Sequence, residues 1–139
     1  MSAKPENTFR ASIHKYLPSN LHHEKMANPY SSGTADDWYS GNKADLWVEY
    51  KFLPRTPQTA SMWLINPNVK KPDLSVLQQQ WLRGRYAEGR NVVVIIGCPD
   101  GGIILQDQEW EQRIDADSFR KRLIPRKAIA QWIADTTTR

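Results

Sequence analysis

An uninterrupted apolar run at residues 92–97, with the sequence VVVIIG, constrains the fold more than any other part of the chain. A strand with one face in water alternates apolar and polar side chains, whereas a run without polar side chains is typical of a strand covered on both faces. The run therefore predicts a central sheet with helices on both sides. The turn at residues 98–102 and the apolar residues 103–105 predict a neighbouring strand.

The rest of the chain mixes helical and strand patterns. Apolar side chains at helical spacing before Pro18 predict a first helix, and a glycine after residue 88 predicts the end of another. The expected elements, in chain order, are a helix at 5–17, a short strand within 21–27, strands at 35–40 and 46–53, a short strand at 62–65, a helix at 73–88, strands at 92–97 and 103–105, and one or two helices ending near 134. The expected fold class is α/β, with a mixed central β-sheet flanked by α-helices.

The length of 139 residues and the hydrophobic content of 40% fit a single domain, with an insert near 54–73 and a helical tail at 107–139. No apolar run approaches the roughly 18 residues needed to cross a bilayer, and the N-terminus lacks a signal-peptide pattern. We therefore expect no membrane contact and a cytoplasmic location, the host cytoplasm if the protein is phage-encoded. With Cys98 as the single cysteine, a metal ion would need oxygen or histidine ligands.

A net charge of +4 and a pI near 9.3 suit a polyanionic partner. The basic residues are densest at 113–127, and the alternative to nucleic-acid binding there is a solvated helical face. The candidate phosphate contacts are Lys25, Arg83, Arg120, Lys121, Arg122, Arg126 and Lys127, followed by Arg85 and Arg90.

The two strands of the expected hairpin carry acidic residues that should meet. Side chains alternate along a strand, so Trp47, Glu49 and Lys51 share one face, with Glu49 and Lys51 roughly 7 Å apart. Hairpin pairing brings Asp36 or Asp37 near Glu49. Converging carboxylates are the ligands that Mg²⁺ prefers, and a nearby lysine can position a water nucleophile, as phosphodiester hydrolysis requires. A Glu-x-Lys pair alone is more often solvated surface.

A family pattern is carried by two segments that follow one another in the chain. They are Gly33-Thr34-Ala35-Asp36 and Trp47-Val48-Glu49-Tyr50-Lys51. The chain resembles the PD-(D/E)XK nuclease superfamily, and within it the small stand-alone VRR-NUC proteins of phages, which are related to Holliday-junction resolvases. Alanine replaces the usual proline, which supplies no ligand. The spacing after the glycine favours Asp36, with Asp37 as the alternative. The likeness covers about residues 6–105.

The resemblance implies a restriction-endonuclease-like core in which Asp36 and Glu49 bind Mg²⁺, for which Mn²⁺ would substitute, and Lys51 is catalytic. It also implies a catalytic glutamine on the next helix, where helical spacing places Gln78 among apolar residues facing the sheet. An acidic residue of the first helix completes the metal site in the family, which fits Glu6. The alternative for Glu6 is an exposed residue that the helix dipole favours.

The expected function is a metal-dependent DNA endonuclease, selective for branched DNA such as four-way Holliday junctions and acting as a homodimer. The alternatives are a general phage DNA-degrading or nicking nuclease, a non-catalytic DNA-binding protein that retains the fold, and an RNA-cutting protein. For the dimer interface we expect the apolar residues 62–65 and Ile129, Trp132 and Ile133, unless the chain covers them itself.

Two further groups of residues complete the expectations. The three histidines, His14, His22 and His23, are interpreted as polar surface, because no carboxylate at ligand spacing is evident apart from Glu24. Most tryptophans are expected to pack in the core or an interface. Trp38 and Tyr39 flank the presumed metal-binding aspartate and are candidates for nucleic-acid contact.

Overall fold

The computed structural model describes residues 4–26 and 33–139. Its centre is a five-stranded sheet in which the spatial order of the strands is their order in the chain. The strands are β1 (His22–Lys25), β2 (Asp37–Ser40), β3 (Asp45–Phe52), β4 (Val92–Cys98) and β5 (Gly101–Leu105). The helices are α1 (Pro5–His14), α2 (Val76–Ala87), α3 (Ala116–Arg122) and α4 (Arg126–Thr137), with a 3-10 turn η1 (Glu109–Glu111).

The sheet is mixed. Strands β3 and β4 are parallel, and every other neighbouring pair is antiparallel. A parallel pair needs a long crossover connection, and here the connection contains the insert at 54–73 and helix α2. The α/β class with a mixed, helix-flanked sheet is confirmed.

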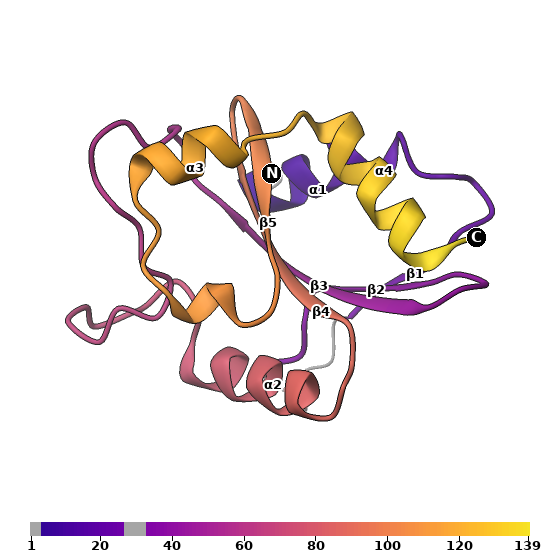
Figure 1. Cartoon of the computed structure of the whole chain (residues 1–139), viewed down its shortest axis with the longest axis horizontal. Coiled ribbons are helices and arrows are strands. Elements are labelled where there is room, and N and C mark those ends of the chain that lie inside the picture. The colour runs from indigo at the N-terminus through magenta and orange to yellow at the C-terminus, as the bar shows by residue number, and fades with distance from the viewer. Residues whose placement is uncertain (1–3, 27–32) are drawn as a thin grey trace.

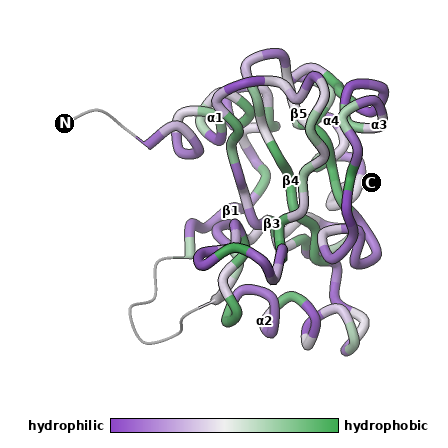
Figure 2. The backbone as a smooth tube through the Cα atoms, turned by 90° about the vertical axis from the view of Figure 1, so that its left-hand side faces the viewer, coloured by the Kyte–Doolittle hydropathy of each residue, from purple (hydrophilic) through white to green (hydrophobic). Residues whose placement is uncertain are grey.

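Helices cover both sides of the sheet, with α2 on one side and α1 and α4 on the other (Figure 1). We call these sides the α2 face and the α1/α4 face. All seven residues of β4 are buried, as the apolar run predicted. Figure 2 shows this strand as a hydrophobic segment between the helices.

Local sequence signals set the ends of α2. The Ser75 side chain accepts a hydrogen bond from the backbone of Gln78, and the Gln78 side chain accepts one from the backbone of Ser75. This capping box satisfies N–H groups that have no partner within the helix. Gly89 follows the helix with a φ of +79°, a conformation in which glycine is unstrained.

The chain itself covers several of the apolar residues that were expected at a dimer interface. Leu64 is buried, and Met62 pairs through its backbone with Ile114, so residues 62–65 form an isolated bridge and not a strand. Ile129 and Ile133 of α4 are buried on the α1/α4 face. Leu64, Ile129 and Ile133 therefore belong to the core and are wrong as interface residues, whereas Met62, Trp63, Ile65 and Trp132 are half-buried and their place in an interface stays a prediction.

Within residues 4–26 and 33–139, no helix combines the length and the apolar character that crossing a membrane requires.

Candidate active site

The pairing of β2 with β3 decides which aspartate faces Glu49. Asp37 lies opposite Val48, and Trp38 lies opposite Trp47. Continuing this register by one residue places Asp36 opposite Glu49. Because side chains alternate, Asp36 lies on the α2 face with Glu49, whereas Asp37 lies on the α1/α4 face.

Four of the predicted site residues meet on the α2 face. The backbone N–H of Tyr50 donates to Oδ2 of Asp36 at 2.8 Å. Nε2 of Gln78 donates to Oε2 of Glu49 at 3.1 Å, and Nζ of Lys51 lies 3.6 Å from the same oxygen. Nζ of Lys51 also donates to Oε1 of Gln78 at 3.4 Å. Glutamine, lysine and glutamate thus form one connected group beside Asp36.

Gly33 allows the segment before Asp36 to lie against the start of α2. Its φ is +93°, and a Cβ atom at this position would lie 2.4 Å from the carbonyl oxygen of Leu77. A larger residue would therefore push the segment away from Gln78. Helical spacing counts Leu77 among the apolar residues that face the sheet around Gln78, but in the structure Leu77 is half exposed, so that expectation is wrong.

The site raises the pKa of both carboxyl groups. Glu49 is 2% exposed, and burial, followed by the negative charge of Asp36, raises its pKa to about 9, although Lys51 opposes the shift. Burial also raises the pKa of Asp36. The charge of half-buried Glu6 on α1 contributes to the Glu49 shift. Without a cation, Glu49 therefore holds a proton at neutral pH.

A divalent cation fits this group of residues. Oε1 of Glu49 is buried and has no hydrogen-bond partner within the described part of the chain. Once Glu49 is ionised, a buried carboxylate oxygen without a partner is costly, and a bound cation would satisfy it. The donors are carboxylate oxygens, which Mg²⁺ and Mn²⁺ prefer.

The Glu49 pKa predicts how pH changes the stability of the metal-free protein. The folded state holds this proton more tightly than the unfolded state, so stability is full below the usual glutamate pKa and falls as pH rises toward about 9. We expect thermal unfolding without divalent ions to shift to lower temperature between about pH 6 and pH 9, and Mg²⁺ to raise it more at the alkaline end.

The matched control for this titration is Glu49→Gln, which cannot ionise. This variant should exceed the wild type in metal-free stability at pH 8.5, by about 1 to 3 kcal/mol. Mg²⁺ should raise the stability of this variant only slightly. Parallel pH profiles for the two proteins would show that Glu49 is not the group responsible.

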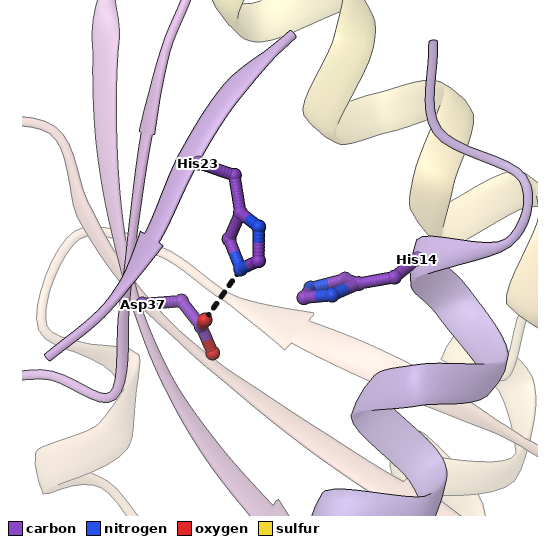
Figure 3. Close-up of side chains that lie close together, drawn as sticks. All are labelled: His14, His23 and Asp37. Atoms are coloured by element: carbon purple, nitrogen blue, oxygen red, sulfur yellow. Dashed lines mark hydrogen bonds and ion pairs between the residues drawn. The ribbon is translucent and has the colours of Figure 1, made fainter. Parts of the chain in front are cut away.

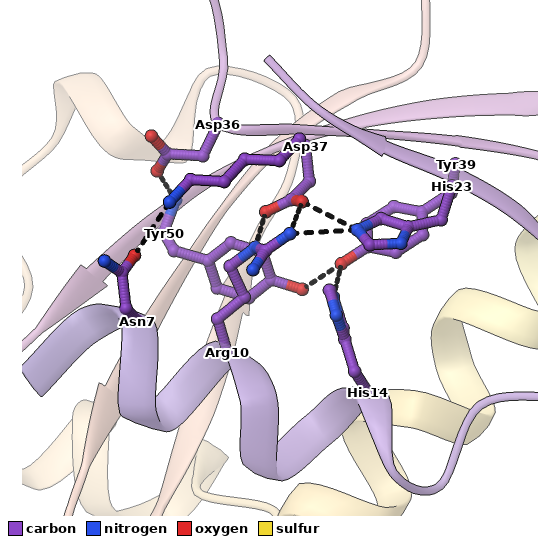
Figure 4. Close-up of polar contacts among 9 residues, drawn as sticks. Asn7, Arg10, His14, His23, Asp36, Asp37, Tyr39 and Tyr50 are labelled. Atoms are coloured by element: carbon purple, nitrogen blue, oxygen red, sulfur yellow. Dashed lines mark hydrogen bonds and ion pairs between the residues drawn. The ribbon is translucent and has the colours of Figure 1, made fainter. Parts of the chain in front are cut away.

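A second polar cluster, formed by Arg10, His14, His23, Asp37 and Tyr39, lies on the α1/α4 face. Asp37 is fully buried, and Arg10 of α1 donates to both of its carboxylate oxygens, each at 2.5 Å. Nε2 of His23 lies 3.0 Å from Oδ1 of Asp37. Nε2 of His14 lies 2.6 Å from the hydroxyl of Tyr39 (Figure 4). Burial and the charge of Arg10 lower the pKa of His14 to about 4, so His14 is neutral at pH 7.

His14, His23 and Asp37 place three potential ligand atoms within 4.8 Å of one another (Figure 3). Arg10, however, bonds both oxygens of Asp37, and its Nη2 lies 2.9 Å from Nε2 of His23. The guanidinium already supplies the positive charge that Asp37 needs, and it would repel a cation. This cluster therefore balances a buried charge, and a metal ion would have to displace Arg10.

The cluster corrects two expectations from the sequence. His14 and His23 are half-buried members of this polar cluster and not free surface side chains, whereas His22 is exposed, with its ring 3.5 Å from a carboxylate oxygen of Glu24. Tyr39 is buried in the α1/α4 core, so its predicted contact with nucleic acid is wrong. Strand alternation could have shown this, because Asp37 and Tyr39 share the face of Val48.

Several of the basic residues proposed to contact phosphate bind other parts of the chain. The acidic partners are Glu111 for Arg83, Glu109 for Arg122 and Asp117 for Arg120. Arg126 donates to Ser12, with its guanidinium 5.1 Å from the centre of the Phe9 ring, and Lys25 donates to Asn7 at 3.4 Å. Lys121 and Lys127 are exposed. The DNA-binding role of this set stays a prediction, with the two lysines as its strongest members.

No protein-family model and no curated protein sequence matches the chain. Among solved structures, the chain is similar to Hjc, a Holliday junction resolvase from the archaeal hyperthermophile Archaeoglobus fulgidus, with a TM-score of 0.53. The match covers 90% of this chain and 99% of the resolvase, with 14% identical residues. The chain therefore has the restriction-endonuclease-like fold of that resolvase, as the sequence predicted.

Proposed function

We propose that the chain is a divalent-metal-dependent endonuclease that hydrolyses phosphodiester bonds in DNA. The observation that carries this proposal is the convergence of Asp36, Glu49, Lys51 and Gln78 on one face of the sheet. One buried oxygen of Glu49 there has no hydrogen-bond partner among residues 4–26 and 33–139. The fold shared with a Holliday junction resolvase supports it. Fold alone does not define an activity, so the side chains are the stronger support.

Asp36 and Glu49 would hold Mg²⁺ or Mn²⁺, with Glu6 as a further ligand. The bound ion would polarise the phosphate and lower the pKa of a coordinated water. Both carboxyl groups must lose their protons before they bind a cation, and Lys51 favours that loss at Glu49.

Lys51 and Gln78 have separate tasks in this proposal. Gln78 holds Glu49 from one side and accepts a hydrogen bond from Lys51, which fixes the position of the ammonium group. The ammonium group orients the attacking water and offsets the negative charge that develops on the phosphate. Because Gln78 also caps α2, the helix start and the site geometry depend on each other.

The proposed substrate is branched DNA, with the four-way junction as the first candidate, and the proposed assembly is a homodimer of the VRR-NUC type. Two sites related by a twofold axis can cut two strands of a junction symmetrically. Light scattering at micromolar concentration tests the assembly. A monomer mass with and without junction DNA would exclude both the homodimer and the symmetric cutting of two strands.

A cleavage panel tests the activity and separates the alternatives. Four-way junction, flap, single-stranded and duplex DNA of matched sequence are incubated with Mg²⁺, with Mn²⁺ or with EDTA. Preferential cutting of the junction supports the proposal in full, and equal cutting of all forms supports a general nuclease. Binding without cutting in either metal identifies a non-catalytic DNA-binding protein.

Salt dependence tests the basic residues. Binding to duplex DNA should weaken with a log-log slope of about 0.9 for each phosphate contact. Replacing Lys121 and Lys127 together with glutamine should reduce the slope by up to about 2. The control replaces Lys70 and Lys71, exposed lysines of the insert, and makes the same change in net charge. Equal slopes in both double variants would assign Lys121 and Lys127 to ordinary surface.

A further inference from the structure

A row of aromatic rings crosses the α2 face beside the carboxylates. The indoles of Trp38 and Trp47 are stacked, with ring centres 5.8 Å apart and planes at 19°. Trp81 of α2 meets Trp47 edge-on at 5.5 Å, and His22 of β1 meets Trp38 at 5.4 Å. We call these four residues the aromatic row. The three tryptophans are half-buried, and His22 is exposed.

Trp38 differs from its neighbours in how it packs. Trp47 and Trp81 pack against the hydrophobic core that α2 covers, so the core accounts for them. Trp38 belongs to neither of the two cores that the described residues form. Its Nε1 is buried and has no hydrogen-bond partner in the same part of the chain. In the part of the chain that the structure describes, Trp38 is therefore linked to the core through its stack on Trp47 and is not itself a member of either core.

The aromatic row lies one step along the sheet from the proposed catalytic group. Trp38 follows Asp36 by two residues, and Trp47 precedes Glu49 by two, so the two pairs lie roughly 7 Å apart on the same face. A DNA strand with its scissile phosphate at Asp36 and Glu49 must continue past the aromatic row or away from it. On the side of the row, the described side chains next to the two carboxylates on this face are the indoles of Trp38 and Trp47.

Basic and amide groups continue this line beyond the row. The guanidinium of Arg85 lies 5.9 Å from the centre of the Trp81 ring. Next to it is a hollow of about 280 Å³, lined by Asp45, Trp47, Arg85, Gly89, Arg90 and Asn91. The acidic residue of this lining, Asp45, accepts a hydrogen bond from Ser40, and Arg85 is paired with Glu88. Arg90 is exposed and suits a phosphate.

We propose that the aromatic row binds an unpaired nucleobase next to the scissile phosphate, with Trp38 as the principal contact. This inference rests on the nuclease function proposed above and adds a substrate class to it, namely DNA whose nucleotides beside the cut are unpaired. Bases of any sequence stack on indole rings, whereas paired bases within a duplex present no free face. The exposed imidazole of His22 closes the outer end of the row edge-on, with its ring beside the carboxylate of Glu24.

Binding of a forked duplex with unpaired arms tests the proposal. Fluorescence anisotropy in EDTA avoids cleavage, and a fully paired duplex of the same length serves as the reference. Trp38→Ala should weaken fork binding by about 5- to 150-fold and leave duplex binding nearly unchanged, whereas Trp38→Phe should retain most of the affinity. The matched control is Trp132→Ala, a half-buried indole on the opposite face of the sheet. Equal losses in both alanine variants, or in both DNA forms, would overturn the proposal.

A second measurement changes the DNA as well as the protein. Removing the bases of the unpaired nucleotides, to leave abasic sites, should weaken binding to the wild type and have little further effect on Trp38→Ala. Additive losses would mean that Trp38 and the bases do not touch. The same fork with Mg²⁺ reports on the function separately. If the fork is bound through Trp38 but not cut, the nuclease function is wrong and the base contact stands. If Trp38→Ala cuts the fork as fast as the wild type, the nuclease function stands and the base contact is wrong.

Discussion

Glu49→Gln should lower Mg²⁺-dependent DNA cleavage by roughly 10³-fold or more while leaving DNA binding nearly intact. A neutral amide is a poor ligand for Mg²⁺, so the loss of one carboxylate removes the charge that holds the cation. The fold should survive, because burial already keeps Glu49 protonated at neutral pH when no metal is bound. An amide therefore replaces a neutral carboxyl group of nearly the same shape.

Two measurements separate a lost metal site from a lost fold. Isothermal titration with Mn²⁺ should show tight binding to the wild type and weak binding to Glu49→Gln, while anisotropy shows similar affinity of both for junction DNA. The matched control is Glu111→Gln, which changes the partner of Arg83 on the surface and should cut normally. If Glu49→Gln cuts DNA within a factor of ten of the wild-type rate, the proposed site is in the wrong place.

The aspartate and glutamate of the candidate site could be predicted because strands alternate with a period of two. Glu49 and Lys51 had to share a face once residues 46–53 formed a strand, and the neighbouring strand had to bring an aspartate. The choice between Asp36 and Asp37 needed the register, which the backbone of the turn at 41–44 determines. The spacing after Gly33 favoured the residue that the register places opposite Glu49.

The cluster around Asp37 could not be predicted, because its partners are distant in the sequence. Arg10 lies 27 residues before Asp37, and the two meet only because α1 packs across the α1/α4 face. The sequence around His14 and His23 likewise gave no sign of the cluster, because their partners are distant in the sequence. The carboxylate next to His23 in the sequence is Glu24, which contacts His22 at the surface instead.

The apolar insert shows a different limit. Residues 62–65 were recognisable as side chains that need a cover, yet sequence pattern does not tell a cover within the chain from a second copy. The structure places Leu64 in the core beside Leu74, and the backbone of Met62 pairs with Ile114 from the tail. The tail that supplies this cover is more than 40 residues away, beyond the reach of local patterns.

Arg10→Ala should destabilise the fold by about 3 to 5 kcal/mol, the largest loss of stability expected from a single substitution in the polar network. Asp37 is fully buried, and both of its oxygens accept hydrogen bonds from Arg10. Removing one partner of a buried pair leaves a charge without compensation in a medium that solvates it poorly. Because a domain of this size is stable by about 5 to 15 kcal/mol, urea denaturation will resolve the change clearly.

The double variant Arg10→Met with Asp37→Asn tests whether the buried charge is the cause. Removing both charges should recover most of the lost stability, since the cost arises from an unpaired carboxylate and not from a missing contact. Arg83→Ala, which breaks a solvent-exposed pair with Glu111, should cost less than about 1 kcal/mol. If the double variant is as unstable as Arg10→Ala, then Arg10 stabilises the fold through packing of its aliphatic stem against the sheet and not through its charge. Asp37 directly follows the metal-binding candidate Asp36, so recovery would also show that this end of β2 keeps its place beneath the site without the buried ion pair.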